Sequence, residues 1–274
     1  MRSILSKIII YGLAGIISLW SLFAIYWMAI SAFRPPKVLL ESSSLVPGPF
    51  SLENLYSLLE QSSYGRYYLN SIFVASSATI ITLIIAVLMA YAMTRFKIKR
   101  TRLILRFVLF SYMFPHMLLV IPIYEIFVLI GIEDTLSSVV IACCTICTPL
   151  SIWLLWGFFK TSPFEIEEAA LVDGASRIQA IYKISLPIAL PGIISAGIFS
   201  FILTWSDYIF ALVLLPSNEK RTVTVGLGAM VEAFSMFWGE IMVGSILVCL
   251  PLFIIFAFLG RYFLQGITAG AIKG

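Results

Sequence analysis

The fold is decided by a polar stretch at residues 161–187, which reads TSPFEIEEAALVDGASRIQAIYKISLP. The run before it, 135–159, has no charged residue, and the run after it, 191–215, has only Asp207. Each run is long enough to cross a membrane, because a transmembrane helix needs about 20 apolar residues. The connection 160–190 is therefore a loop of about 30 residues, and loops of that length are uncommon unless they carry structure or function.

The loop contains the start and stop signals of a short helix. Ser162 is a good N-cap, Pro163 suits the first helical position, and Glu165 completes a capping box. Gly174 suits the left-handed residue that ends a helix. The pattern predicts a helix over about 163–173.

A second short helix is predicted over 176–185, with Ser176 as its N-cap. We expect Pro187 and Pro191 to break it before the next span, because proline lacks a backbone N–H and disrupts a helix interior. The loop is thus predicted to be a helix–turn–helix element that protrudes from the membrane.

The composition of the whole chain agrees with a membrane protein. Its 274 residues are 61% hydrophobic and 12% charged, whereas soluble domains have roughly 45–50% and about 25%. This excludes a soluble enzyme, a nucleic-acid-binding protein and a disordered tail. We predict an all-α membrane protein with six transmembrane helices, at 8–33, 69–94, 107–132, 135–159, 191–215 and 241–260.

The run 8–33 is read as a retained span, because a secretory signal has a core of only about 7–15 residues. Three prolines, Pro115, Pro122 and Pro149, are expected to kink or break their helices.

The basic residues predict the orientation. With the N-terminus inside, 13 of the 18 Lys and Arg residues fall on inner segments. Because cytoplasmic loops collect Lys and Arg, both termini are predicted to be cytoplasmic. The net charge of +4 is therefore no argument for nucleic-acid binding. Six of these cations lie between the second and third spans and are compatible with a lipid headgroup patch, to which the sequence gives no separate function: Arg95, Lys97, Lys99, Arg100, Arg102 and Arg106.

The four cysteines lie inside apolar runs, Cys143, Cys144 and Cys147 in one and Cys249 in another. A Cys144-x-x-Cys147 metal or redox pair would need a His or a second pair beside it. We interpret them as small packing residues.

The loop resembles a known motif. The matching positions are Glu168, Ala169, Ala170, Gly174, Ile184, Leu186 and Pro187. This pattern is similar to the loop motif of permease subunits of binding-protein-dependent ABC importers. The resemblance implies a type I ABC importer transmembrane fold, in which a cytoplasmic coupling helix docks in a groove on an ATP-hydrolysing subunit. The small Ala169 and Ala170 would let the backbone of that partner approach closely.

Other strings resemble the carbohydrate branch of that family. They are FSLEN at 50–54, Trp205-Ser206-Asp207, where Asn is commoner in the middle, and the terminal string 266–274. The likeness is to the shorter, G-type permease subunit of maltose systems and not to the longer F-type subunit. It implies a first helix and extracytoplasmic loop over 1–68, a transmembrane domain over 69–264 and a cytoplasmic tail over 265–274.

The resemblance also implies partners and a location in the cell membrane. The partners are a homologous second permease subunit, two ATP-binding subunits, an extracytoplasmic sugar-binding protein and membrane lipids, with no nucleic acid. ATP would be bound by the partner subunits, because the chain has no G-x-x-x-x-G-K-[ST] string. We therefore expect no cofactor and no enzymatic activity. The alternatives are a permease for glycerol phosphate or a polyol, and a proton-coupled secondary transporter.

Ionisable residues inside the spans are candidates for the substrate path. A carboxylate of Asp207 or Glu125 could accept hydrogen bonds from sugar hydroxyls, and Trp205 or Tyr208 could stack on a sugar ring. Equally, the two acids could cap or tie helices. His116 could relay protons, although a packing or cavity role is favoured because no acidic chain accompanies it in sequence.

Overall fold

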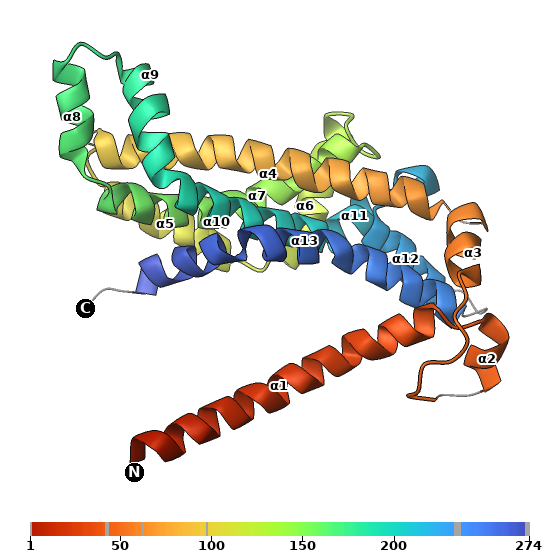
Figure 1. The fold of residues 1–274 in the computed structure, drawn as a ribbon. Helices are drawn as coiled ribbons and strands as arrows, with labels where there is room; N and C mark the ends of the chain where they lie inside the picture. The colour runs from red at the N-terminus through yellow and green to blue at the C-terminus, as the bar shows by residue number, and fades with distance from the viewer. Residues whose placement is uncertain (1, 42–43, 62, 97, 233–236, 272–274) are drawn as a thin grey trace. The chain divides into compact units, whose positions relative to one another are not determined.

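The computed structural model describes residues 2–41, 44–61, 63–96, 98–232 and 237–271, and its regular structure in these ranges is helical (Figure 1). The α-helices are α1 (Arg2–Ala32), α2 (Pro36–Glu41), α3 (Glu53–Gln61), α4 (Tyr64–Arg95), α5 (Thr101–Met113), α6 (His116–Leu129), α7 (Leu136–Thr161), α8 (Phe164–Val172), α9 (Arg177–Ala180), α10 (Leu186–Trp205), α11 (Ile209–Leu214), α12 (Val223–Glu232) and α13 (Trp238–Ala271). A π-helical turn covers Ile181–Ser185 and a 3₁₀ turn covers Asn218–Lys220.

Within the described residues, five helices are long and apolar enough to cross a membrane, and a sixth span exists if the bent pair α5–α6 counts as one. The five are Ser6–Ala32, Tyr64–Arg95, Leu136–Thr161, Arg177–Trp205 and Trp238–Tyr262. The prediction of an all-α membrane protein is confirmed.

The third predicted span is not one straight helix. The predicted span over 107–132 corresponds to the latter part of α5 and to α6, which meet at an angle of 92°. Phe114 lies between them in an extended conformation, with ψ of 132°. The cause is Pro115, whose ring disfavours helical geometry at the preceding residue. The expected break at Pro115 is thus confirmed, whereas Pro122 and Pro149 lie inside α6 and α7.

The fifth span also differs from its prediction. It begins earlier, because α9, the π-helical turn and α10 follow one another without interruption, as a single stretch Arg177–Trp205. The expected break at Pro187 and Pro191 is wrong. The amide of Leu186 donates to the carbonyl of Ile181, five residues back, so the backbone pairing shifts register just before Pro187. Pro187 then stands in the first turn of α10, where proline is tolerated.

The span ends early as well. Helix α10 stops at Trp205, and α11 starts at Ile209 after three non-helical residues. The predicted uninterrupted span over 191–215 is therefore wrong. The carboxylate of Asp207 accepts a hydrogen bond from the amide of Ala211, at 3.0 Å, and so satisfies a donor at the start of α11.

The chain forms two compact units, one of Met1–Gly65 with Gly226–Leu250 and one of Arg66–Val225 with Pro251–Gly274. In the first unit, the amide of Asn54 donates to the carbonyls of Ala32 and Arg34. The hydroxyl of Tyr64 donates to the carbonyl of Gly244 at 2.6 Å. These bonds hold α3 and the start of α4 against their neighbours inside this unit.

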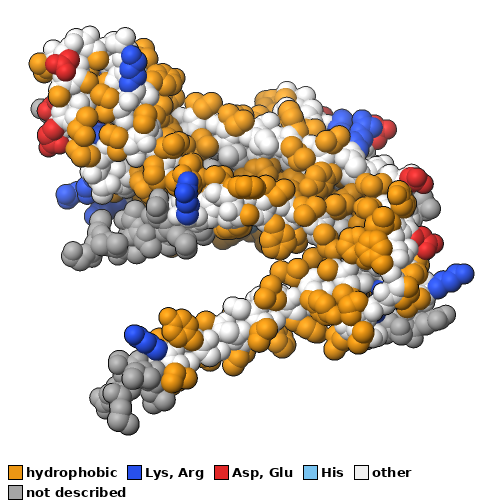
Figure 2. All heavy atoms as spheres, in the orientation of Figure 1, with side chains coloured by type: hydrophobic (Ala, Val, Ile, Leu, Met, Phe, Trp, Pro, Cys, Tyr) orange, Lys and Arg blue, Asp and Glu red, His pale blue; other side chains and the backbone are white. Residues whose placement is uncertain are grey.

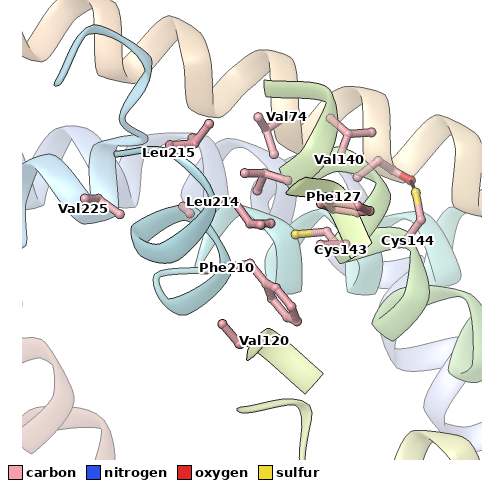
Figure 3. Packing of buried hydrophobic residues seen from close by; sticks show 14 residues of the cluster. Val74, Val120, Phe127, Val140, Cys143, Cys144, Phe210, Leu214, Leu215 and Val225 are labelled. Carbon is pink, nitrogen blue, oxygen red and sulfur yellow. Dashed lines mark hydrogen bonds between the residues drawn. The ribbon is translucent and has the colours of Figure 1, made fainter. Parts of the chain in front are cut away.

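The second unit has two clusters of buried apolar residues. Figure 3 shows Phe210 and Leu214 of α11 lying among Val120, Phe127 and Cys143. Another cluster joins α4, α5, α7 and α10 through buried residues such as Leu155. Packing of this kind holds membrane helices together, since lipid tails are as apolar as leucine and give no hydrophobic driving force.

Gly192 permits the close approach of α10 to α7. A Cβ atom added at Gly192 would lie 2.4 Å from Cγ and 3.0 Å from Cβ of Phe158. These Phe158 atoms are close to the backbone of α7, so the helices themselves would have to separate.

We therefore expect Gly192→Val to destabilise the chain by about 1–3 kcal/mol, as overpacking of a tight interior does. The measurement is unfolding in mixed detergent micelles. The matched control is Gly157→Val on α7, since no atom lies within 4 Å of a Cβ added at Gly157. Equal stability of the two variants would contradict the close approach at Gly192.

Candidate functional site

The loop between α7 and α10 is a helical hairpin. Figure 1 shows α8 (green) and α9 (teal) projecting beyond the ends of α4 and α10. Helix α8 ends as predicted, with Gly174 in the left-handed region at φ of 90°. The amide of Ala175 donates to the carbonyl of Ala170 at 3.0 Å, and the amide of Gly174 to that of Leu171 at 3.2 Å. These two hydrogen bonds together form a Schellman motif, which satisfies the last carbonyls of the helix.

The start of α8 differs from the prediction. The capping box of Ser162 and Glu165 does not form: Pro163 occupies the N-cap position, and no side chain caps the helix. Ser162 instead ends α7, where its amide donates to the carbonyl of Phe158. Ser162 and Pro163 are the two residues between the helices; Ser162 is the C-cap of α7 and Pro163 is the N-cap of α8.

The predicted cap of the second helix is confirmed. The hydroxyl of Ser176 accepts a hydrogen bond from the amide of Gln179, and the side chain of Gln179 accepts one from the amide of Ser176 at 2.9 Å. This capping box fixes the turn between α8 and α9.

The motif residues have different exposures. Glu168, Ala169 and Gly174 are exposed, whereas Ala170 is half-buried. Figure 2 shows acidic side chains on the projecting end that carries α8. Further along, Ile184 and Leu186 are half-buried and Pro187 is exposed. The hairpin thus offers Glu168 and Ala169 to a partner while its base packs onto the helices.

Sequence reasoning missed the residue that fixes the hairpin, Glu167. Its side chain is only 3% exposed and forms an ion pair with Arg95 of α4, with 2.9 Å between Nε and the carboxylate. The hydroxyl of Ser185 donates to the same oxygen at 2.7 Å, and the hydroxyl of Tyr91 donates to the other. One carboxylate therefore joins α8, α4 and the π-helical turn. Three glutamates lie within four positions on α8, and nothing in the sequence shows which of them turns inward.

A cavity of about 260 Å³ lies near the break between α10 and α11. Its walls include His116, Cys143, Thr204, Asp207 and Tyr208. Asp207 has two contacts here besides the cavity: its carboxylate caps α11, and its carbonyl accepts a hydrogen bond from Thr224 at 2.6 Å. The structure therefore brings together three of the five residues proposed for the substrate path.

The other two are placed elsewhere. Residue Trp205 is 2% exposed. Its ring stacks on Phe201 at 5.7 Å between centroids and meets Tyr68 edge-on at 5.5 Å. This position favours a packing role for Trp205 over sugar stacking. Glu125 is exposed on α6 and is not part of the cavity wall.

Comparison with known proteins agrees with this architecture. The family described as "Binding-protein-dependent transport system inner membrane component" matches residues 54–269. The chain belongs to this family. It is a multi-pass membrane subunit of an ABC importer and not an enzyme, and importers of this kind work with a partner permease, ATPase subunits and a binding protein.

Two relatives are similar along their whole length. The inner membrane ABC transporter permease protein YcjP of Escherichia coli (strain K12) is 32% identical and covers 98% of each chain. The trehalose/maltose transport system permease protein MalG of Thermococcus litoralis is also 32% identical, with 100% of this chain and 99% of that protein covered. Among solved structures, a bacterial ABC transporter involved in the import of the acidic polysaccharide alginate has a TM-score of 0.80 at 22% identity, covering 94% of this chain and 96% of that one. This likeness shows the type I importer fold.

The Glu167 network makes a prediction about the hairpin. Removal of one partner of a buried ion pair costs about 3–5 kcal/mol, because the other charge is left buried and unpaired. We expect Glu167→Ala to raise amide hydrogen exchange over 164–172 at least about tenfold. Glu168→Ala, which removes an exposed carboxylate from the same helix, is the control and should leave exchange unchanged. Similar exchange in the two variants would refute the anchoring role of Glu167.

Proposed function

We propose that this chain is the permease subunit of an importer for a disaccharide or oligosaccharide. The observation that carries the importer role is the α8–α9 hairpin, with Glu168 and Ala169 exposed and Glu167 anchored in the interior. The carbohydrate class is supported by relatives such as the trehalose/maltose permease of Thermococcus litoralis and the diacetylchitobiose permease DasC of Streptomyces coelicolor. Glycerol phosphate or a polyol is the alternative cargo. A proton-coupled secondary transporter has no support from these relatives.

The proposed assembly has this chain beside a homologous second permease subunit, two ATP-binding subunits and an extracytoplasmic sugar-binding protein. Both termini and the α8–α9 hairpin lie in the cytoplasm. The chain binds no cofactor, and ATP is held by the partner subunits.

Motion passes from α8 to the substrate path in this proposal. When the ATP-binding subunits close, they displace α8. Glu167 transmits the displacement to α4 through Arg95 and to the start of α10 through Ser185, at 2.9 and 2.7 Å. Helix α10 then runs without a break from Leu186 to Trp205, about 30 Å at 1.5 Å per residue. Its far end adjoins Asp207 and the cavity.

The cavity supplies part of the proposed path. Carboxylate and hydroxyl groups of Asp207, Thr204 and Tyr208 can exchange hydrogen bonds with sugar hydroxyls, and the Tyr208 ring offers a surface for stacking. The second permease subunit would complete the path from the opposite side.

The coupling role is tested by Glu168→Arg and by Gly174→Val. The first reverses the charge on the docking face, and the second places a β-branched residue at φ of 90°, which is strained for any residue with a Cβ. We expect both to reduce sugar uptake at least about tenfold and to lower co-purification of the ATP-binding subunits. Glu165→Arg is the matched control on the same helix. The proposed function would be refuted if either test variant folded, failed to co-purify with the ATP-binding subunits and still transported sugar normally.

The path is tested by Asp207→Asn. This change removes the negative charge, but the carboxamide oxygen of the new asparagine can still accept the capping hydrogen bond of α11. We therefore expect the chain to fold. We expect uptake to fall about tenfold or more, with the ATP-binding subunits still attached. Unchanged uptake and unchanged selectivity among sugars would remove Asp207 from the substrate path and leave it the capping role alone.

A further inference from the structure

We infer that the groove between the start of α5 and the end of α7 is a binding site for an anionic phospholipid. Two adjoining cavities form it, of about 730 and 300 Å³, and both are lined by Arg102, Trp156 and Lys160. The inference is independent of which cargo the importer carries.

The α5 wall of the groove alternates basic and apolar side chains on one helix face. Arg102, Leu105, Arg106 and Leu109 occupy positions i, i+3, i+4 and i+7, which share one face of a helix, and all four line the smaller cavity. Helix α5 presents this face to α7, whose Trp153, Trp156 and Lys160 line the same cavity. The cations of α5 thus lie beside the last turn of another span.

The α7 wall adds two aromatic residues and a third cation. Trp153, Trp156 and Lys160 line the smaller cavity at the same spacing of three and four residues. The ammonium of Lys160 lies 4.8 Å from the centre of the Trp156 ring, within the range of a cation–π contact. Tryptophan is enriched where a membrane helix leaves the hydrocarbon, with its ring at the level of the headgroups.

The three cations have no carboxylate partner among the described residues. The ion pairs found there involve Arg66, Arg95 and Lys220, and Arg102, Arg106 and Lys160 are all exposed. The larger cavity also has Arg95 and Glu165 in its wall. Arg95 is neutralised by Glu167, so the groove carries three cations against the single carboxylate of Glu165.

Cations and apolar side chains line the same groove, and this combination favours a lipid as the ligand. A free phosphate would meet the cations but would leave the apolar wall of Leu105, Leu109 and Trp153 uncovered. A phospholipid meets both, with its phosphate between Arg102, Arg106 and Lys160 and an acyl chain along the apolar side chains. Basic pockets between transmembrane helices are suited to anionic headgroups for this reason.

The test uses the complete purified transporter and lipid counting by native mass spectrometry. The transporter is given equal amounts of phosphatidylglycerol and phosphatidylcholine. The test variant is Arg102→Gln with Arg106→Gln, and the control is Lys7→Gln with Arg261→Gln, two exposed cations outside the groove on the same side in the proposed orientation. Each cation near an anionic lipid contributes about fivefold in affinity. We therefore expect phosphatidylglycerol affinity to fall about 25-fold in the test variant and to stay unchanged in the control.

Further arms separate the alternative ligands. Lys160→Gln should lower phosphatidylglycerol affinity about fivefold, and soluble glycerophosphate should fail to displace the lipid. Displacement by glycerophosphate would show a site for a free anion and overturn the inference. Equal retention of phosphatidylcholine, or unchanged retention of phosphatidylglycerol in the test variant, would overturn it too. A photo-crosslinker at Leu109 should label lipid, and a crosslink to another subunit instead would show that protein fills the groove.

Discussion

The whole arrangement depends on one buried carboxylate. Glu167 is surrounded by donors from two other elements. Helix α4 contributes the guanidinium of Arg95 and the hydroxyl of Tyr91, and the π-helical turn contributes the hydroxyl of Ser185. A buried charge is tolerated only when it is paired and hydrogen-bonded, so these groups must stay together. Any displacement of α8 relative to α4 or to the π-helical turn would break these contacts and leave the carboxylate buried without its partners.

The second constraint is the register shift before α10. Pairing between Leu186 and Ile181 over five residues places Ser185 toward Glu167 and lets Pro187 stand where no amide donor is needed. Without this turn, a proline after Leu186 would end the helix, and the hairpin would connect to the span through a flexible joint. π-Helical turns of this kind are often found at functional sites. Here the turn lies at the point where the hairpin joins α10.

Much of this could be predicted from the sequence, and the failures have physical causes. Apolar runs located the spans, Pro115 predicted the break between α5 and α6, and Gly174 and Ser176 predicted the turn of the hairpin. Local signals failed where two elements compete for one residue, as at Ser162, or where a rare backbone pairing overrides the rule against proline, as at Pro187. The inward side of α8 could not be predicted, because it depends on a cation 72 residues away in the sequence.

The sequence also could not show which of the candidate path residues line the cavity. Asp207, Trp205 and Tyr208 are neighbours in sequence, yet the break after α10 sends them to different surroundings: Trp205 packs against Phe201, whereas Asp207 and Tyr208 line the cavity. The capping bond from Ala211 to Asp207 maintains that break. A structural role and a role in transport are thus not alternatives for Asp207, since the cap holds open the turn that exposes the carboxylate to the cavity. In the proposed path, the carboxylate that stabilises the broken helix is also the group that a sugar hydroxyl would meet.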